Sequence, residues 1–186
     1  MAVLRGACMA LLVLCAGSFL WATGGAFFRK VEAPTLRLRA IQTLGVIAFT
    51  ANFAALWAQG SFSTSAGTVA LGAYLASLAV FWWSIATHAA KPPSHAFSSD
   101  PPTHLVIDGP YRAIRHPFYT SYLLTWVAGP VATQRLSLLI PLGIMIALYW
   151  HAAHLEERKF SACALAADYA RYRSRSGMFL PKLPLN

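Results

Sequence analysis

The sequence is poor in acidic residues and in cysteine. Its 186 residues include 6 Asp and Glu against 15 Lys and Arg, and only 3 cysteines. The cysteines lack the paired spacing of zinc ligands and offer no disulfide framework, so we expect no metal site and no disulfide scaffold. The sequence also lacks a P-loop, a GxGxxG fingerprint and a recognisable Ser-His-Asp arrangement. These absences argue against the common nucleotide-binding and hydrolase classes.

Apolar residues are abundant instead. They make up 57% of the chain, and the mean hydropathy of +0.51 is too high for a soluble domain of this length. We therefore predict a single all-α, integral membrane domain over residues 1–186. The formal net charge of +9 does not indicate nucleic acid, because the basic residues flank apolar runs instead of forming one basic stripe.

Five apolar runs predict five transmembrane helices. They cover residues 7–28, 40–58, 66–90, 118–133 and 136–153. The first run is longer than the core of a signal peptide, so we expect it to be retained as a helix. Residues 1–90 would then form a three-helix membrane part, and residues 91–186 a cofactor-binding, catalytic part. A polar amphipathic helix is expected from His154 onward.

The distribution of basic residues predicts the orientation in the membrane. Thirteen of the fifteen Lys and Arg residues lie in the segments 29–39 and 91–117 or after the fifth run; Arg5 and Arg135 alone fall on the other side. Basic residues gather on the cytoplasmic side of membrane proteins. We therefore expect the N-terminus outside and the C-terminus in the cytoplasm, most simply in a bacterial inner membrane, with membrane lipids as neighbours.

A polar island over residues 108–119 interrupts the apolar runs. Gly109 and Pro110 favour a turn, and Pro117 fits the first turn of the following helix, with His116 at or beside its N-cap. The free N–H groups and the dipole of that helix start would favour a ligand carboxylate or phosphate. The preceding proline-rich segment, residues 91–104, is expected to be a loop of the lid or binding kind.

Two glutamates are expected to meet this island. Glu156 and Glu157 would lie at the same membrane face as His116, where a carboxylate can accept hydrogen bonds from an ammonium group or from ribose hydroxyls. Tyr111 and Tyr119 could stack on a purine or face a cation. Such a pocket suits an amino-acid nucleoside with a positive centre, such as S-adenosylmethionine, although the chemistry alone also admits other nucleotides.

The polar residues of this region also form a family pattern. It reads Leu105-Val106-x-x-Gly109-x-Tyr111-x-x-x-Arg115-His116-Pro117-x-Tyr119, then Glu156-Glu157, then Tyr169-x-x-Tyr172. This pattern, over residues 103–182, resembles the isoprenylcysteine carboxyl methyltransferase family and its bacterial relatives. The resemblance implies an S-adenosylmethionine-dependent methyltransferase whose loop and C-terminal helix cover the cofactor pocket.

The resemblance also implies roles for individual residues. It places Arg115, His116 and Tyr119 at the catalytic centre and lets a lipophilic acceptor enter laterally from the bilayer. The acceptor would be isoprenoid, prenylcysteine-like or of lipid type, and the methyl group would pass to it directly once acceptor and sulfonium carbon are aligned and water is excluded. The residues implied to bind S-adenosylmethionine are Thr103, His104, Leu105, Val106, Tyr111, His116, Pro117, Phe118, Tyr119 and Glu156.

One departure concerns the acceptor. The prenylcysteine enzymes carry an arginine four positions before the first glutamate, where this sequence has Ala152. Arg112, His151 or His154 is a candidate replacement that would bind the substrate. A lipid amine, a thiol or another isoprenoid acceptor stays open. Two other functions also remain: an NADPH-dependent membrane reductase of the sterol reductase type, and a small transporter or assembly factor in which the island only anchors a loop.

Overall fold

In a computed structural model of the chain, the described residues are 1–28, 36–88 and 102–182. This part of the chain is helical and contains no β-strand, as predicted. Most of the expected lid loop lies outside it. In chain order the elements are α1 (Ala2–Trp21), the π-helix η1 (Ala22–Ala26), α2 (Leu36–Trp57), α3 (Thr64–Thr87), the 3-10 helix η2 (Gly109–Arg112), α4 (Pro117–Thr133), the 3-10 helix η3 (Leu136–Leu138), α5 (Leu139–Ser161) and α6 (Ala166–Arg175).

Four helical segments are long and apolar enough to cross a membrane. They are Ala2–Ala26, Leu38–Trp57, Thr64–Thr87 and Leu136–Ser161. Much of their surface is formed by exposed apolar side chains, which fits an integral membrane protein. The fifth expected span, α4, has only 17 residues and does not belong to this group.

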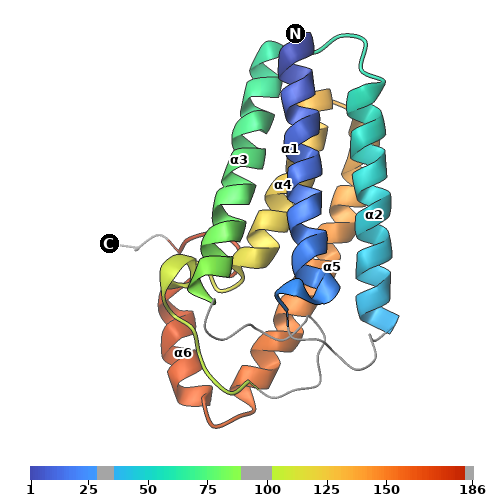
Figure 1. Cartoon of the computed structure of the whole chain (residues 1–186). Helices are drawn as coiled ribbons and strands as arrows, with labels where there is room; N and C mark the ends of the chain where they lie inside the picture. Colours follow the sequence, from blue (N-terminus) through green and yellow to red (C-terminus); the bar gives the residue numbers. More distant parts are fainter. Residues whose placement is uncertain (29–35, 89–101, 183–186) are drawn as a thin grey trace.

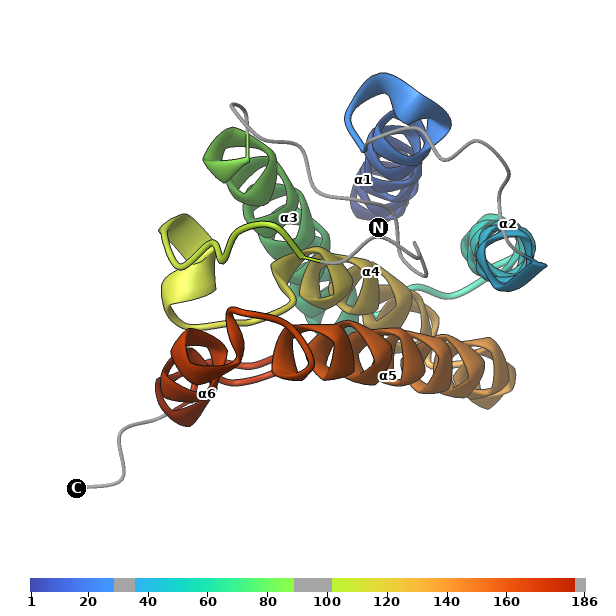
Figure 2. The ribbon, with the colours of Figure 1, turned by 90° about the horizontal axis from the view of Figure 1, so that it is seen from below.

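Helix α4 occupies the centre of the bundle, among α1, α2, α3 and α5 (Figure 2). It packs most closely against α3, where the hydroxyl of Ser77 donates to the carbonyl of Ser121 at 2.7 Å and lies 2.8 Å from the hydroxyl of Thr125. Buried polar groups that are paired in this way fix the register of two helices without an unsatisfied donor. The helix that opens with the island is thereby held in the core of the molecule.

The α2–α3 connection lies at the end of the bundle farthest from α6 (Figure 1). A set of hydrogen bonds closes this end. The Gln59 side chain donates to the carbonyl of Thr133 at 3.1 Å and accepts from Arg135 Nε at 3.2 Å, and Arg5 donates to the Gln59 carbonyl at 2.6 Å. The α2–α3 and α4–α5 connections therefore lie together. Helix α4 runs the length of the bundle from the α6 end to this end.

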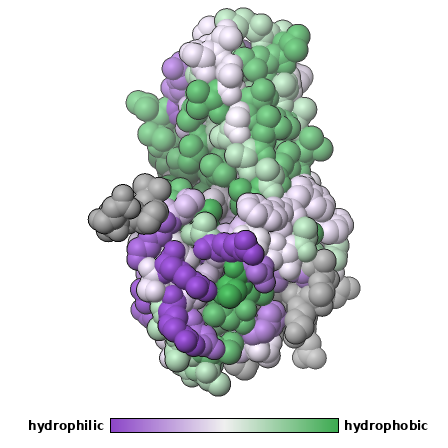
Figure 3. Space-filling model, turned by 90° about the vertical axis from the view of Figure 1, so that its left-hand side faces the viewer, coloured by the Kyte–Doolittle hydropathy of each residue, from purple (hydrophilic) through white to green (hydrophobic). Residues whose placement is uncertain are grey.

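The C-terminal third differs from the expected boundaries. Helix α5 continues through His154 to Ser161, so the prediction that a separate helix begins at His154 was wrong. The chain turns only after Ser161, and the basic helix α6 contributes to the hydrophilic end of the molecule, below an apolar surface (Figure 3). The change from apolar to polar residues at His154 suggested a helix boundary, but α5 continues past it.

Candidate functional site

The island folds as its turn residues predict. Gly109 has a positive φ of 56° at the start of η2, and His116 is the N-cap of α4 with Pro117 as its first residue. The Tyr172 hydroxyl of α6 donates to the Tyr111 carbonyl at 2.8 Å. Burial raises the pKa of Tyr172 to about 12, so this hydroxyl stays protonated and remains a donor. Helix α6 is thus fastened to the turn.

The residues after α6 return to the same turn. An isolated parallel bridge joins Ile114 to Gly177: the N–H of Arg115 donates to the Gly177 carbonyl at 2.8 Å, and the N–H of His116 donates to the Met178 carbonyl at 3.1 Å. These bonds pack the segment around Met178 back on the domain. They also hold His116 in place from the backbone side.

Glu157 is the buried centre of a charge network at this turn. Its Oε1 accepts from Arg115 Nε at 2.8 Å and lies 3.3 Å from His116 Nε2, while its Oε2 lies 3.5 Å from Arg173 Nε. The Glu157 side chain is only 6% exposed. A carboxylate this deeply buried needs several charged partners to offset its desolvation, and the network supplies three.

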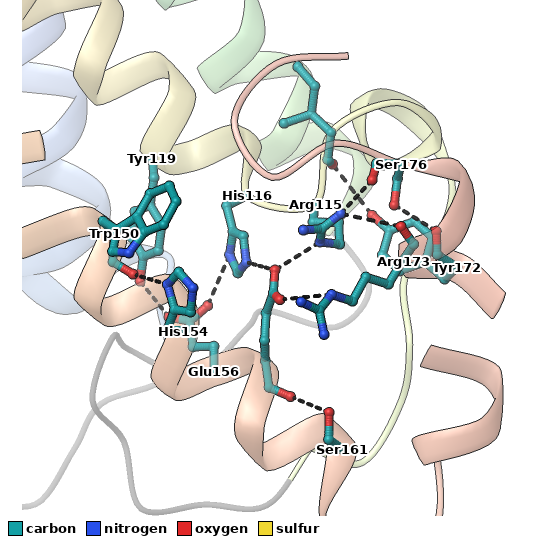
Figure 4. Close-up of polar contacts among 12 residues, drawn as sticks. Arg115, His116, Tyr119, Trp150, His154, Glu156, Ser161, Tyr172, Arg173 and Ser176 are labelled. Atoms are coloured by element: carbon teal, nitrogen blue, oxygen red, sulfur yellow. Dashed lines mark hydrogen bonds and ion pairs between the residues drawn. The ribbon is translucent and has the colours of Figure 1, made fainter. Parts of the chain in front are cut away.

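Glu156 faces the other side of the same histidine. Its Oε2 lies 3.4 Å from His116 Nδ1, and its Oε1 accepts the hydroxyl proton of Tyr119. Burial lowers the pKa of His116, but the hydrogen bonds and charges of Glu156 and Glu157 act in the opposite direction and leave this pKa above its usual value near 6.5. His116 thus links both glutamates through its two ring nitrogens (Figure 4).

Arg115 is held in this framework through its Nε and Nη1 atoms. Besides Glu157, its guanidinium donates to the carbonyl of Ser176 and, at 3.5 Å, to that of Arg173. The side chain therefore ties the end of α6 to the turn before α4. This role is positional, and it explains why the arginine precedes His116 directly in the sequence.

A cavity of about 1270 Å³ opens beside the network. Every residue that the sequence pattern assigned to S-adenosylmethionine lines it, together with the predicted catalytic Arg115. These cofactor candidates are Thr103, His104, Leu105, Val106, Tyr111, His116, Pro117, Phe118, Tyr119 and Glu156. The structure thus brings Glu156 together with residues as early in the chain as Thr103.

The cavity continues from this polar end into the apolar bundle, between α1 and α2. Its walls there include Gly17 and Leu20 of α1 and Gly45 and Val46 of α2. None of the α1 or α2 residues that line the cavity is charged. The cavity therefore has a polar end near His116 and Glu156 and an apolar groove between α1 and α2.

Several lining residues were missed in the sequence. Tyr122 and Trp126 lie on the same face of α4 as Tyr119, at helical spacing, and Tyr149 of α5 stacks on Tyr119 at a ring distance of 5.3 Å. The spacing along α4 was visible in the sequence. An aromatic stripe on an apolar helix is usual in a protein core, so it gave no functional signal.

The three proposed substrate residues do not line the cavity. The Arg112 side chain is 79% exposed and lies 3.9 Å from Asp108. His151 is exposed on α5, and the His154 ring contacts Trp150 and its carbonyl. The hypothesis that one of them replaces the family's arginine has no support in this arrangement.

No protein-family model matches the chain, and no curated protein matches its sequence.

Proposed function

We propose that this protein is an S-adenosylmethionine-dependent methyltransferase acting on a lipophilic acceptor at the membrane interface. One observation carries the proposal: the cavity that contains the whole predicted cofactor set is continuous with an apolar groove between α1 and α2. Its volume of about 1270 Å³ exceeds the roughly 300–1000 Å³ typical of a pocket for one small molecule. There is room for a cofactor at the polar end and an acceptor in the groove.

The residues present fit the cofactor. Glu156 offers a partly exposed carboxylate for an ammonium group or ribose hydroxyls, and the start of α4 offers N–H groups for a carboxylate. Tyr111 supplies an aromatic surface for a purine. Bound there, S-adenosylmethionine would supply a methyl group on a sulfonium, and the chain's part would be to hold the two reactants in line and keep water out.

The same geometry argues against an NADPH-dependent reductase. Phosphate groups need guanidinium or ammonium donors that are available to them. The Nε and Nη1 atoms of Arg115 are engaged by Glu157 and by two backbone carbonyls, and Arg112 lies outside the cavity. Lys159 is the other Lys or Arg residue among the described cavity-lining residues, so few basic groups face the cavity. A cofactor with one carboxylate and one positive centre is the better match.

The membrane arrangement belongs to the proposal as well. Helix α4 is short, but it runs between the two ends of the bundle beside α3 and α5 (Figure 1). We infer that all five helices from α1 to α5 cross the membrane. The basic end with α6 then faces the cytoplasm of a bacterial inner membrane, and the N-terminus faces outward.

Binding of the cofactor product tests the proposal directly. S-adenosylhomocysteine should bind the purified protein in calorimetry, and Glu156→Ala should abolish this binding without unfolding the protein. Asp168→Ala is the matched control, because this exposed carboxylate on α6 does not line the cavity. Incubation with radiolabelled S-adenosylmethionine and a native lipid extract should yield a labelled lipid. Wild-type protein that binds neither ligand would refute the proposal.

A further inference from the structure

Two further tyrosines line the cavity next to Tyr119. Tyr122 of α4 and Tyr149 of α5 both line it, and their rings are 5.5 Å apart. Tyr149 precedes Glu156 by seven residues, which places it roughly 10 Å farther along the helix axis, toward the bilayer interior. Polar groups at this depth are costly to bury unless they are hydrogen-bonded.

These hydroxyls have hydrogen-bonding capacity to spare. The indole N–H of Trp126 donates to the Tyr149 oxygen at 3.3 Å, which leaves the Tyr149 O–H free to donate in turn. Within the described part of the chain, the hydroxyl of Tyr122 makes no hydrogen bond. Two O–H donors therefore meet the same apolar space.

The residues that line the groove determine whether a charged or an uncharged group can bind there. The lining residues of α1 and α2 are apolar or carry hydroxyl or amide groups, and the nearest charged group along α5 in the cavity wall is the carboxylate of Glu156. A carboxylate placed beside Tyr122 and Tyr149 would lose its hydration with no cation to replace it. An uncharged oxygen would lose much less and could accept both phenolic donors.

We propose that Tyr122 and Tyr149 bind the head of the lipophilic acceptor, and that this head is an uncharged, hydrogen-bond-accepting group such as a hydroxyl. The chain of the acceptor lies in the groove between α1 and α2, against Gly17 and Gly45. Only the identification of the bound lipid as a methyl acceptor rests on the proposed function. The binding preference itself follows from the groove alone.

Two pairs of amphiphiles that differ only in their heads test this preference. Farnesol is compared with farnesoic acid, and 1-dodecanol with dodecanoic acid, by calorimetry on the full-length protein in nanodiscs at neutral pH. At least one alcohol should bind about tenfold or more tightly than its acid. Equal affinity within both pairs, a preference for the acids, or no binding of either alcohol would overturn the proposal.

Phenylalanine variants test the two residues. Tyr122→Phe and Tyr149→Phe should each weaken alcohol binding roughly fivefold, the range expected for one hydrogen bond, and leave S-adenosylhomocysteine binding unchanged. Tyr74→Phe is the control, because the Tyr74 hydroxyl is buried without a partner and does not line the cavity. Unaltered alcohol affinity in both tyrosine variants would refute the assignment. Loss of S-adenosylhomocysteine binding in the wild type, with the alcohol preference intact, would refute the proposed function alone.

Discussion

The side chain of Glu157 determines how the island and α6 hold together. It is buried among Arg115, His116 and Arg173, at distances of 2.8, 3.3 and 3.5 Å. Removing the Glu157 charge leaves Arg115 and His116 buried without compensation, although Arg173 is 58% exposed. Such a loss is more costly than the intact network is stabilising. The glutamate that does not line the cavity is thus the structural one, while Glu156 faces the cavity.

Glu157→Gln should therefore lower the free energy of unfolding by about 3 kcal/mol, measured by titration with a denaturing detergent. Asp168→Asn breaks a salt bridge to Arg171 at the exposed surface of α6 and should change this free energy by less than about 0.5 kcal/mol. Similar losses of unfolding free energy in the two variants would show that the network around Glu157 stabilises the protein no more than an exposed salt bridge does.

His116 should make stability depend on pH. Its pKa in the folded protein is raised above the usual 6.5, so the folded state binds the proton more tightly than the unfolded chain. This contribution is complete below about pH 6.5 and is lost as pH rises through the raised pKa. The melting temperature of the wild type should exceed that of His116→Gln by more at about pH 6 than at about pH 9. A difference that stays constant or grows with pH would contradict the assignment.

At the scale of elements, the apolar groove depends on how α1 and α2 face each other. Gly45 of α2 lines the cavity, and a Cβ at this position would meet no atom within 4 Å. Gly72 of α3 is equally open but does not line the cavity. The two glycines therefore allow a larger side chain to be added inside and outside the groove without a clash in the backbone.

Gly45→Leu should reduce methyl transfer to the lipid acceptor about tenfold, which corresponds to about 1.4 kcal/mol, because the added side chain occupies the groove. Binding of S-adenosylhomocysteine at the polar end should be unchanged, and Gly72→Leu should leave both measurements unchanged. Equal activity of the two variants in a radiolabel assay would place the acceptor elsewhere.

The helices could be predicted from the sequence far better than their ends. Long apolar runs have to form helices in a membrane, because no other unclosed structure satisfies the backbone there. The end of α5 was missed because Glu156 and Glu157 look like the start of a surface helix, whereas both turn inward to partners about forty residues earlier. Hydropathy contains no information about such long-range partners.

Only the site residues that belong to a recognisable sequence motif could be predicted. The turn, the N-cap and the ten cavity-lining candidates follow from the pattern around His116 and Glu156. His154, by contrast, lies two residues before Glu156, which is about 200° around the helix and so on the opposite face. Ala152, one turn before Glu156, lies on the same face of α5 but does not line the cavity and has no polar group. In our proposal, Tyr122 and Tyr149 therefore recognise the acceptor in its place.

The whole molecule has two unlike ends. At one end Arg5, Arg135 and Gln59 join the loops, and at the other the charged network and the basic helix α6 lie beside the cavity. An apolar surface separates them (Figure 3). If α4 crosses the membrane, the number of crossings is odd and the N- and C-termini face opposite compartments.

Cysteine labelling can decide this arrangement. In a Cys163→Ser background, a membrane-impermeant maleimide applied to intact spheroplasts should label Ser65→Cys in the first turn of α3 and Ser137→Cys before α5. Ser174→Cys on α6 should react only after permeabilisation. All three serines are exposed, and Cys8 and Cys15 are buried, so the reagent's access to the compartment decides the result. Labelling of Ser65→Cys without Ser137→Cys would show that α4 does not cross, and labelling of Ser174→Cys alone would reverse the orientation.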